Sequence, residues 1–305
     1  MKKVLITGAN GLLGQKLVRL LSETGNYHTI ATSRGESRLS EALPRVTYQA
    51  LDITDRTAVL ALFDEQQPDY VVNTAAMTNV DQCESDREGC IALNVDAVAY
   101  LIEGCQKHNA FLLHLSTDFI FDGEAGPYDE TATPNPLSFY GQSKWDAEKL
   151  VEASGLRWAI GRTVLVYGLV PQMSRSNIVL WVKKSLEDGK DIHVVDDQWR
   201  TPTLAEDLAQ GCELILRHDA TGIFHLSGDE LMTPYELALR TARAFGLNEA
   251  LIHQTDGSRF TQPAKRPPRT GFILDKAKSQ LAYRPHSFEA GLHLLEQQLT
   301  GKAVI

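Results

Sequence analysis

The chain opens with a short apolar run that leads directly into three evenly spaced glycines. Residues 4–6 have the length and the β-branched content of a buried parallel strand. Gly8, Gly11 and Gly14 follow, and leucines at helical spacing come after them. A strand, a glycine-rich turn and a helix in this order aim backbone N–H groups and a helix N-terminus at a pyrophosphate. A turn that merely contains glycines is the simpler interpretation, but its place directly after a strand favours dinucleotide binding.

Strand-like and helix-like segments alternate through the first half of the chain. We expect strands near residues 3–7, 28–32, 46–50, 69–73, 110–116 and 157–162, and helices near 11–24, 55–66, 86–107 and 139–154. This alternation predicts an α/β fold, a Rossmann-type doubly wound parallel sheet with helices on both faces. Ligands of such sheets bind outside the carboxyl ends of the strands. Residues at expected strand ends should therefore converge on one crevice, and these are Gly8, Asp52, Asn73 and Thr117.

A tyrosine and a lysine lie four positions apart in the segment 138–144. On a helix this spacing places the Tyr140 phenol and the Lys144 ammonium on one face, about one turn apart. A free phenol has a pKa of about 10 and is a poor acid at neutral pH. A fixed positive charge nearby favours the phenolate, so we expect Lys144 to lower the Tyr140 pKa and Tyr140 to exchange a proton during carbonyl chemistry. The same spacing also occurs on ordinary helix surfaces, and the glycine turn is what favours the catalytic interpretation.

Composition limits the class of protein. A chain of 305 residues with 43% hydrophobic content can bury the core of one large domain or of two. No stretch approaches the ~20 apolar residues that span a bilayer, and the first residues are typical of a strand and not of a signal peptide. We therefore expect a cytoplasmic protein with no membrane partner. The net charge of −9 argues against nucleic acid as a partner.

The cysteines and histidines show neither a disulfide pattern nor a metal-site pattern. His114 and His193 have no partner at ligand spacing, and we interpret them as core or sheet-edge residues. We therefore expect no metal. The cysteines lack a C-x-x-C pair and are expected to be reduced structural thiols; they are Cys83, Cys90, Cys105 and Cys212.

Longer strings make the chain similar to the extended short-chain dehydrogenase/reductase family. The strings run from Asn73 to Ala76, from Ser116 to Gly123 and from Pro134 to Lys144. The second and third of them resemble strings of the dTDP-4-dehydrorhamnose reductases within that family. The resemblance extends from residue 3 to about residue 270. It implies NADPH-dependent reduction of the 4-keto group of a nucleotide sugar, with dTDP-4-dehydro-L-rhamnose as substrate and dTDP-L-rhamnose as product.

The resemblance also assigns roles to particular residues. Tyr140 would donate a proton to the sugar carbonyl oxygen, Lys144 would hydrogen-bond the nicotinamide ribose, and Thr117 would hydrogen-bond the same carbonyl oxygen. The neighbouring Asp118 is left without a role. Besides Tyr140 and Lys144, the implied cofactor-binding residues are Gly8, Asn10, Gly11, Leu12, Leu13, Ser33, Arg34, Asp52, Ile53, Asn73, Ala75 and Ala76.

The residues after the expected second strand indicate which nicotinamide cofactor is used. NAD-preferring enzymes place a carboxylate there for the ribose 2′-hydroxyl, whereas this chain has none before Glu36. Ser33 and Arg34 suit a 2′-phosphate, because a guanidinium can bind phosphate through two hydrogen bonds. The sequence therefore favours NADPH, and use of NADH is left open.

Members of the family divide the second half of the chain between the sheet and a small substrate domain. By this resemblance, residues 1–168 form the NAD(P)-binding domain, a segment near 196–222 returns to it, and residues 169–305 mainly build a smaller C-terminal substrate-binding domain. The elements expected there are helices near 176–188, 204–217, 234–245 and 287–299, and strands near 191–195 and 223–226.

The substrate side of the resemblance is less regular. The segment 197–203 departs from the family's D-Q-x-G-x-P-T pattern, because Trp199 and Arg200 replace the usual glycine. A bulky, charged side chain there could reshape the wall of the nucleotide site, which leaves the identity of the sugar nucleotide open. The implied substrate-binding residues are Thr78, Val80, Asn177, Trp199 and Arg266.

Two other functions of the same fold are open. A sugar-nucleotide epimerase or dehydratase would retain its NAD, and the pair Ser33 and Arg34 counts against that function. A non-catalytic, NADP-binding regulatory subunit similar to the methionine adenosyltransferase β subunit would share the fold, and the intact set of catalytic residues favours an enzyme instead. The expected helices near 86–107 and 139–154 are candidate faces for a homodimer.

Overall fold

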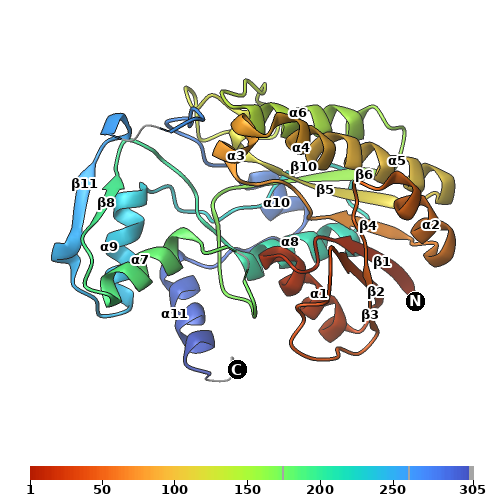
Figure 1. The fold of residues 1–305 in the computed structure, drawn as a ribbon, viewed down its shortest axis with the longest axis horizontal. Coiled ribbons are helices and arrows are strands. Elements are labelled where there is room, and N and C mark those ends of the chain that lie inside the picture. Colours follow the sequence, from red (N-terminus) through yellow and green to blue (C-terminus); the bar gives the residue numbers. More distant parts are fainter. Residues whose placement is uncertain (174, 260–261, 302–305) are drawn as a thin grey trace.

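A parallel sheet of seven strands forms the centre of the computed structural model, which describes residues 1–173, 175–259 and 262–301 (Figure 1). Its order is β10-β6-β5-β4-β1-β2-β3, and all neighbours are parallel. The chain builds from β1 toward one edge and then crosses to β4, so the strand order reverses between β1 and β4. This confirms the predicted Rossmann-type doubly wound sheet and places a crevice at the carboxyl ends of these two strands. The strands are β1 (Lys2–Thr7), β2 (Tyr27–Ser33), β3 (Val46–Ala50), β4 (Tyr70–Asn73), β5 (Phe111–Thr117), β6 (Trp158–Thr163) and β10 (Gly222–His225).

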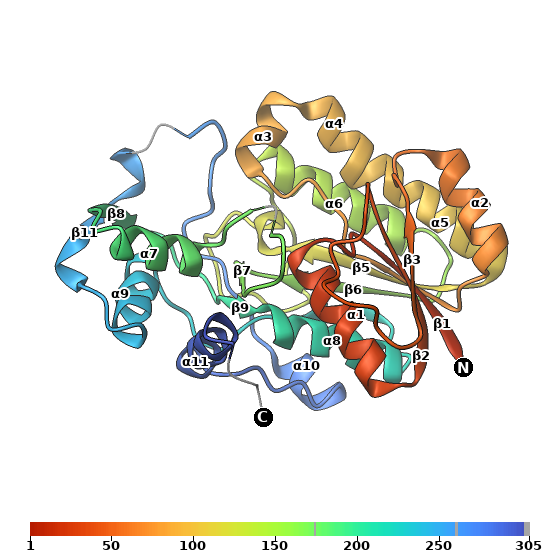
Figure 2. The same ribbon diagram turned by 60° about the horizontal axis from the view of Figure 1, so that its bottom comes forward.

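Helices cover both faces of the sheet, because successive side chains of a buried strand point to opposite faces (Figure 2). On one face, α1 and α8 pack against each other, and their Leu17 and Leu208 share a core with Ile6 of β1. On the other face, α2, α5 and α6 enclose Leu5, the neighbour of Ile6 in the same strand. These helices are α1 (Leu12–Thr24), α2 (Arg56–Gln66), α5 (Ala97–His108), α6 (Phe139–Glu152) and α8 (Ala205–Arg217).

Beyond residue 168 the chain contributes to two places. The segment with α8, β10 and α10 (Asp275–Gln280) lies on the sheet, where Ala277 joins the core. A second cluster, seen at the left of Figure 1, is built on the parallel pair of β8 (Ile192–Val195) and β11 (Ile252–Thr255). Its helices are α7 (Ile178–Glu187), α9 (Pro234–Ala244) and α11 (Phe288–Leu299). The assignment of these segments to two domains stays a prediction.

All the strands and helices expected from the sequence are present. The helix expected near 86–107 consists of α4 (Arg87–Ile91) and α5, joined by a π-helical turn at 92–96. Short elements without a clear hydrophobic period were not predicted. They are α3 (Val80–Ser85), β7 (Val166–Tyr167), β9 (Thr203–Leu204), β11 and α10.

The described part of the chain contains no disulfide, no metal-binding cluster and no helix that could span a membrane. All four cysteines are buried and free. Within the described ranges, no three side chains of His, Cys, Asp and Glu gather closely enough to hold a metal ion. None of the helices in those ranges is both long and apolar enough to cross a membrane.

Candidate active site

A cavity of about 1000 Å³ opens at the carboxyl ends of β1, β4 and β5. The glycine turn and the segment that follows β5 line it on the side of the sheet, and His193 of β8 lines it on the side of the second cluster. This volume lies at the upper end of the range for small-molecule sites, which suits a dinucleotide together with a second ligand. The site therefore lies where the strand order predicts it.

The glycine turn brings the backbone close to the sheet and leaves the start of α1 open. Gly8 has a φ of +70°, and a Cβ there would lie 2.8 Å from the backbone nitrogen of Ala75. A Cβ on Gly14 would lie 2.3 Å from the Gly8 carbonyl oxygen, so only glycine lets the helix approach the strand this closely. Gly11 is the N-cap of α1 and supplies no side chain to cap it. The first N–H groups of α1 therefore remain available to an anion in the cavity, where Gly11, Leu12 and Leu13 form part of the lining.

Only some of the predicted contacts to the adenosine half of a cofactor line the cavity. Arg34 lines it, whereas Ser33, at the end of β2, does not. Asn10 lines the cavity and holds the loop after β2, because its side-chain nitrogen donates to the Glu36 carbonyl at 2.8 Å and its oxygen accepts from the Arg38 N–H at 2.8 Å. Asn10 therefore positions the loop that carries Arg34.

Six predicted cofactor residues lie outside the lining: Gly8, Ser33, Asp52, Ile53, Asn73 and Ala75. Asp52 accepts hydrogen bonds from the N–H and the hydroxyl of Thr54 at 3.0 and 2.7 Å, and Ile53 packs in the core. Ala75 does not line the cavity although Ala76 does, and Asn73 is buried and hydrogen-bonds to Thr7 and His114. A place at a strand end therefore brings a residue near the crevice but does not fix which way its side chain points.

The predicted catalytic residues Thr117, Tyr140 and Lys144 all line the cavity and are all buried. Thr117 is the last residue of β5, and the other two lie one turn apart at the start of α6. The Ser138 hydroxyl caps this helix by accepting from the Gly141 N–H at 3.2 Å. A sheet end and a capped helix start therefore bring three side chains together in the cavity lining.

Burial sets the protonation of Tyr140 and Lys144. Loss of hydration raises the pKa of Tyr140 above its usual value, and a hydrogen bond with Thr117 opposes this shift. The predicted lowering of the Tyr140 pKa is therefore wrong in direction, because burial outweighs the other influences on the phenol. Burial also lowers the pKa of Lys144 to about 8, against an opposing influence of the Glu148 carboxylate. Near neutral pH the phenol thus keeps its proton and can act as an acid.

A buried chain of polar side chains leads from β1 to Lys144. Thr7 donates its hydroxyl to the Asn73 side-chain oxygen at 2.6 Å, and the Asn73 amide nitrogen lies 3.1 Å from His114 Nδ1. The other ring nitrogen, His114 Nε2, lies 3.1 Å from Lys144 Nζ, and Lys144 also donates to the Leu115 carbonyl at 2.7 Å.

The tautomer of His114 depends on the charge of Lys144. If Lys144 is an ammonium it can only donate, so Nε2 of the ring must accept from it. Burial, aided by the Lys144 charge, holds the pKa of His114 well below its ordinary value, so its ring is neutral. A neutral ring accepts on one nitrogen and donates on the other. The sequence suggested a core histidine here, and only the contact with Lys144 reveals its connection to the site.

Four of the five predicted substrate-binding residues line the cavity. Thr78 accepts a hydrogen bond from Arg175 Nη1 at 3.2 Å, and Arg266 pairs with Asp81 at 2.7 Å, which fixes two cations at the wall. The full set of predicted substrate residues in the lining is Thr78, Val80, Asn177 and Arg266.

Trp199, the fifth of these residues, lies outside the lining. The residue is 36% exposed, and its ring lies under the Arg269 guanidinium. Backbone hydrogen bonds of residue 199 to residues 268 and 270 hold that part of the chain, and the neighbouring Arg200 points inward instead. The departure from the family pattern therefore affects the site through Arg200.

The fold and the three buried side chains define the class of the extended short-chain dehydrogenase/reductases. More narrowly, the chain belongs to the RmlD substrate binding domain family, whose model matches residues 1–300. It is 30% identical over 304 residues to the dTDP-4-dehydrorhamnose reductase of Aggregatibacter actinomycetemcomitans, which covers 96% of this chain and 97% of that one.

Two further relatives are informative. The structure of the Bacillus anthracis str. Ames dTDP-4-dehydrorhamnose reductase in complex with NADP has a TM-score of 0.85 at 26% identity, and covers 98% of this chain and 100% of that one. The methionine adenosyltransferase 2 subunit beta of Mus musculus is 34% identical over 251 residues, 81% of this chain and 73% of that one. These findings confirm the predicted family.

Proposed function

We propose that this protein reduces the 4-keto group of a nucleotide sugar with NADPH, and that its substrate is dTDP-4-dehydro-L-rhamnose. The observation that carries the proposal is the burial of Thr117, Tyr140 and Lys144 in the lining of the cavity that also contains the glycine turn. The two reductase relatives support the substrate, since each is similar over nearly the whole chain.

The residues of the chain fit NADPH and divide the chemistry among them. NADPH, when bound, supplies the hydride for the carbonyl carbon. The open N-terminus of α1 would bind the pyrophosphate and Arg34 the 2′-phosphate. Tyr140 is protonated at neutral pH and would donate its proton to the carbonyl oxygen. Lys144 is mostly protonated below its pKa of about 8, and its charge would stabilise the phenolate that remains.

Two arginines in the lining suit a nucleotide diphosphate. Arg266 is held by the Asp81 carboxylate, and Arg175 lies beside Thr78, so two guanidinium groups face the space from different segments. Guanidinium groups bind phosphate oxygens through paired hydrogen bonds. We infer that the diphosphate of the substrate binds beside these two guanidinium groups and its sugar beside Tyr140.

Arg34→Ala is expected to weaken NADPH binding by about 10- to 100-fold and to leave NADH binding almost unchanged. A hydrogen bond to a charged group contributes about 1.5–3 kcal/mol, and only NADPH carries the 2′-phosphate that Arg34 would bind. Titration of each cofactor by fluorescence measures both dissociation constants. Arg38→Ala is the matched control, because Arg38 lies in the same loop but outside the cavity lining. If binding of NADPH and NADH weakened by the same factor, Arg34 would not bind the 2′-phosphate.

The direct test of the function is NADPH oxidation on addition of enzymatically generated dTDP-4-dehydro-L-rhamnose. Near-ultraviolet absorbance follows the cofactor, and mass spectrometry of the sugar nucleotide identifies the product. Formation of dTDP-L-rhamnose supports the proposal. Tight NADPH binding without turnover of this compound would overturn the proposed substrate.

The mouse relative favours a second candidate, an NADP-binding subunit that regulates a methionine adenosyltransferase. In that case the chain would bind NADPH without oxidising it and would alter the kinetics of a catalytic partner. A change in the KM of an added methionine adenosyltransferase, retained by Tyr140→Phe, would support this function. An unchanged KM of the methionine adenosyltransferase would rule out this regulatory function.

A further inference from the structure

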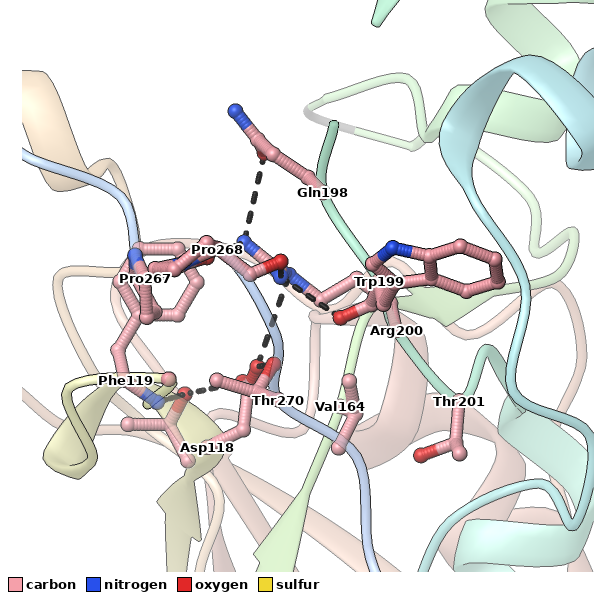
Figure 3. Close-up of polar contacts among 12 residues, drawn as sticks. Asp118, Phe119, Val164, Gln198, Trp199, Arg200, Thr201, Pro267, Pro268 and Thr270 are labelled. Atoms are coloured by element: carbon pink, nitrogen blue, oxygen red, sulfur yellow. Dashed lines mark hydrogen bonds and ion pairs between the residues drawn. The ribbon is translucent and has the colours of Figure 1, made fainter. Parts of the chain in front are cut away.

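Asp118, which the sequence leaves without a role, is buried and lies beside Thr270 and Arg200 (Figure 3). One carboxylate oxygen accepts the Thr117 hydroxyl at 3.1 Å, and the other accepts the hydroxyl of Thr270. The Phe119 N–H donates to the Thr117 oxygen at 3.2 Å. Asp118 thus joins the last residue of β5 to the C-terminal segment 265–270, and it holds the side chain of a proposed catalytic residue.

The nearest positive charge to Asp118 is that of Arg200, whose Nε lies 3.8 Å from Oδ2 of Asp118. Arg200 is itself buried, and its guanidinium lies over the Phe119 ring. Burial raises the pKa of Asp118, and the Arg200 charge opposes that shift. A buried carboxylate without a counter-charge becomes protonated at a higher pH. Arg200 therefore favours the ionised form of Asp118.

Arg200 also ties the segment 265–270 to the sheet. Its Nη2 donates to the Pro267 carbonyl at 2.7 Å, and its Nη1 donates to the Trp199 carbonyl at 2.7 Å and lies 3.4 Å from the Pro268 carbonyl. The same two stretches of chain also exchange backbone hydrogen bonds. One guanidinium thus contacts the carboxylate that binds Thr117 and the segment that carries Thr270.

The direction of the two hydroxyl hydrogen bonds depends on the charge of Asp118. An ionised carboxylate is an acceptor only, so Thr117 and Thr270 must both donate to it. A protonated carboxyl group can donate instead, and one of these hydrogen bonds would then reverse. The orientation of the Thr117 hydroxyl is therefore linked to the charge of Asp118. While Asp118 is ionised, the single Thr117 proton points to the carboxylate, so Thr117 presents its oxygen to the cavity as an acceptor and does not donate to the sugar carbonyl as the resemblance implies.

We propose that Arg200 is a positioning residue, which holds Asp118 ionised so that Thr117 keeps one orientation and the segment 265–270 stays in register with it. Arg200 acts through Asp118 and touches no reacting atom in this proposal. The inference rests on the proposed reductase function. It concerns a position where the sequence departs from the glycine of the reductase pattern.

Other charges around Asp118 do not replace Arg200. Tyr140 faces Asp118 from α6, and the carboxylate raises the pKa of that phenol. Arg266 and Asp197 act on Arg200, the first lowering its pKa and the second raising it. Arg266 is also paired with Asp81. Loss of Arg200 would therefore leave Asp118 without its main counter-charge.

The test compares Arg200→Gln, Arg200→Lys and the wild type in ketosugar reduction across pH. Arg200→Gln should move the acid limb of kcat upward by about 1–3 pH units, because a neighbouring opposite charge lowers a carboxyl pKa by that amount. Arg200→Lys should return the limb toward the wild-type position, with a raised KM because its single ammonium cannot make the same contacts with two carbonyls. Arg269→Gln is the matched control, since Arg269 lies in the same segment but is exposed and does not contact Asp118.

A second measurement does not depend on activity. Carbon NMR of protein labelled at aspartate, with Asp118→Asn to assign the resonance, reports the titration of Asp118 directly. An upward shift of that titration in Arg200→Gln supports the proposal even if the sugar substrate is misassigned. An unchanged titration, or a loss of kcat by the same factor at every pH, would overturn it. An acid-limb shift in Arg269→Gln as large as that in Arg200→Gln would do the same.

Discussion

Tyr140→Phe is expected to lower kcat for ketosugar reduction by about 10²- to 10⁴-fold, the usual contribution of a general acid. The substitution removes one hydroxyl and keeps the ring, which is buried and packs edge-on against Phe119. The free energy of unfolding and the dissociation constant of NADPH should therefore change little. Stopped-flow measurement of NADPH oxidation in a single turnover separates the chemical step from binding and release.

The reaction should not lose its proton donor as the pH rises through neutrality. Burial raises the pKa of Tyr140, so the proton donor stays protonated through neutral pH. Tyr100→Phe is the matched control, because Tyr100 lies on α5 outside the cavity lining. Equal loss of activity in both variants would indicate a general effect on the fold. If the kcat of Tyr140→Phe stayed within a few-fold of the wild-type value, Tyr140 would not be the general acid.

The sequence predicts well the strands, turn and helix that carry the site, because these elements depend on local patterns. Apolar runs, glycine spacing and helical periods lie within single segments, and they identify the sheet, the turn before α1 and the start of α6. Thr117, at the carboxyl end of β5, lines the cavity as the strand-end argument predicts, whereas Gly8, Asp52 and Asn73 do not.

The sequence does not predict side-chain direction or contacts between distant segments. Asn73 and Asp52 stand near strand ends as expected, but Asn73 is buried and contacts His114, and Asp52 binds its own loop. Arg200 contacts residues 267 and 268, which lie far along the chain, so its role depends on the tertiary structure. The direction of the Tyr140 pKa shift also depends on tertiary structure, because a spacing of four residues gives no measure of burial.

Glu148→Gln is expected to lower the free energy of unfolding by about 3–5 kcal/mol, the usual result of removing one partner of a buried ion pair. Glu148 on α6 and Arg162 on β6 are almost fully buried, and their closest approach is 2.7 Å. Arg162 Nη1 has no hydrogen-bond partner among the described residues, so Glu148 supplies the main compensation for this buried cation. Urea denaturation of each variant measures the loss.

Glu152→Gln is the matched control, because Glu152 lies one turn further along α6 and is exposed. The double variant Glu148→Met with Arg162→Met should recover much of the lost stability, since replacing a whole buried pair by apolar side chains is often neutral. Failure of the double variant to recover would mean that packing around the pair matters more than its charge balance.

The buried pair also connects stability to catalysis. Glu148 opposes the effect of burial on Lys144, so Glu148→Gln should lower the Lys144 pKa further below about 8. Lys144 would then lose its proton at a lower pH, and the alkaline limb of kcat/KM should move downward. The double variant should show this shift despite its recovered stability, because the carboxylate is still missing. An alkaline limb that follows stability instead would mean that Glu148 acts on catalysis only through the fold.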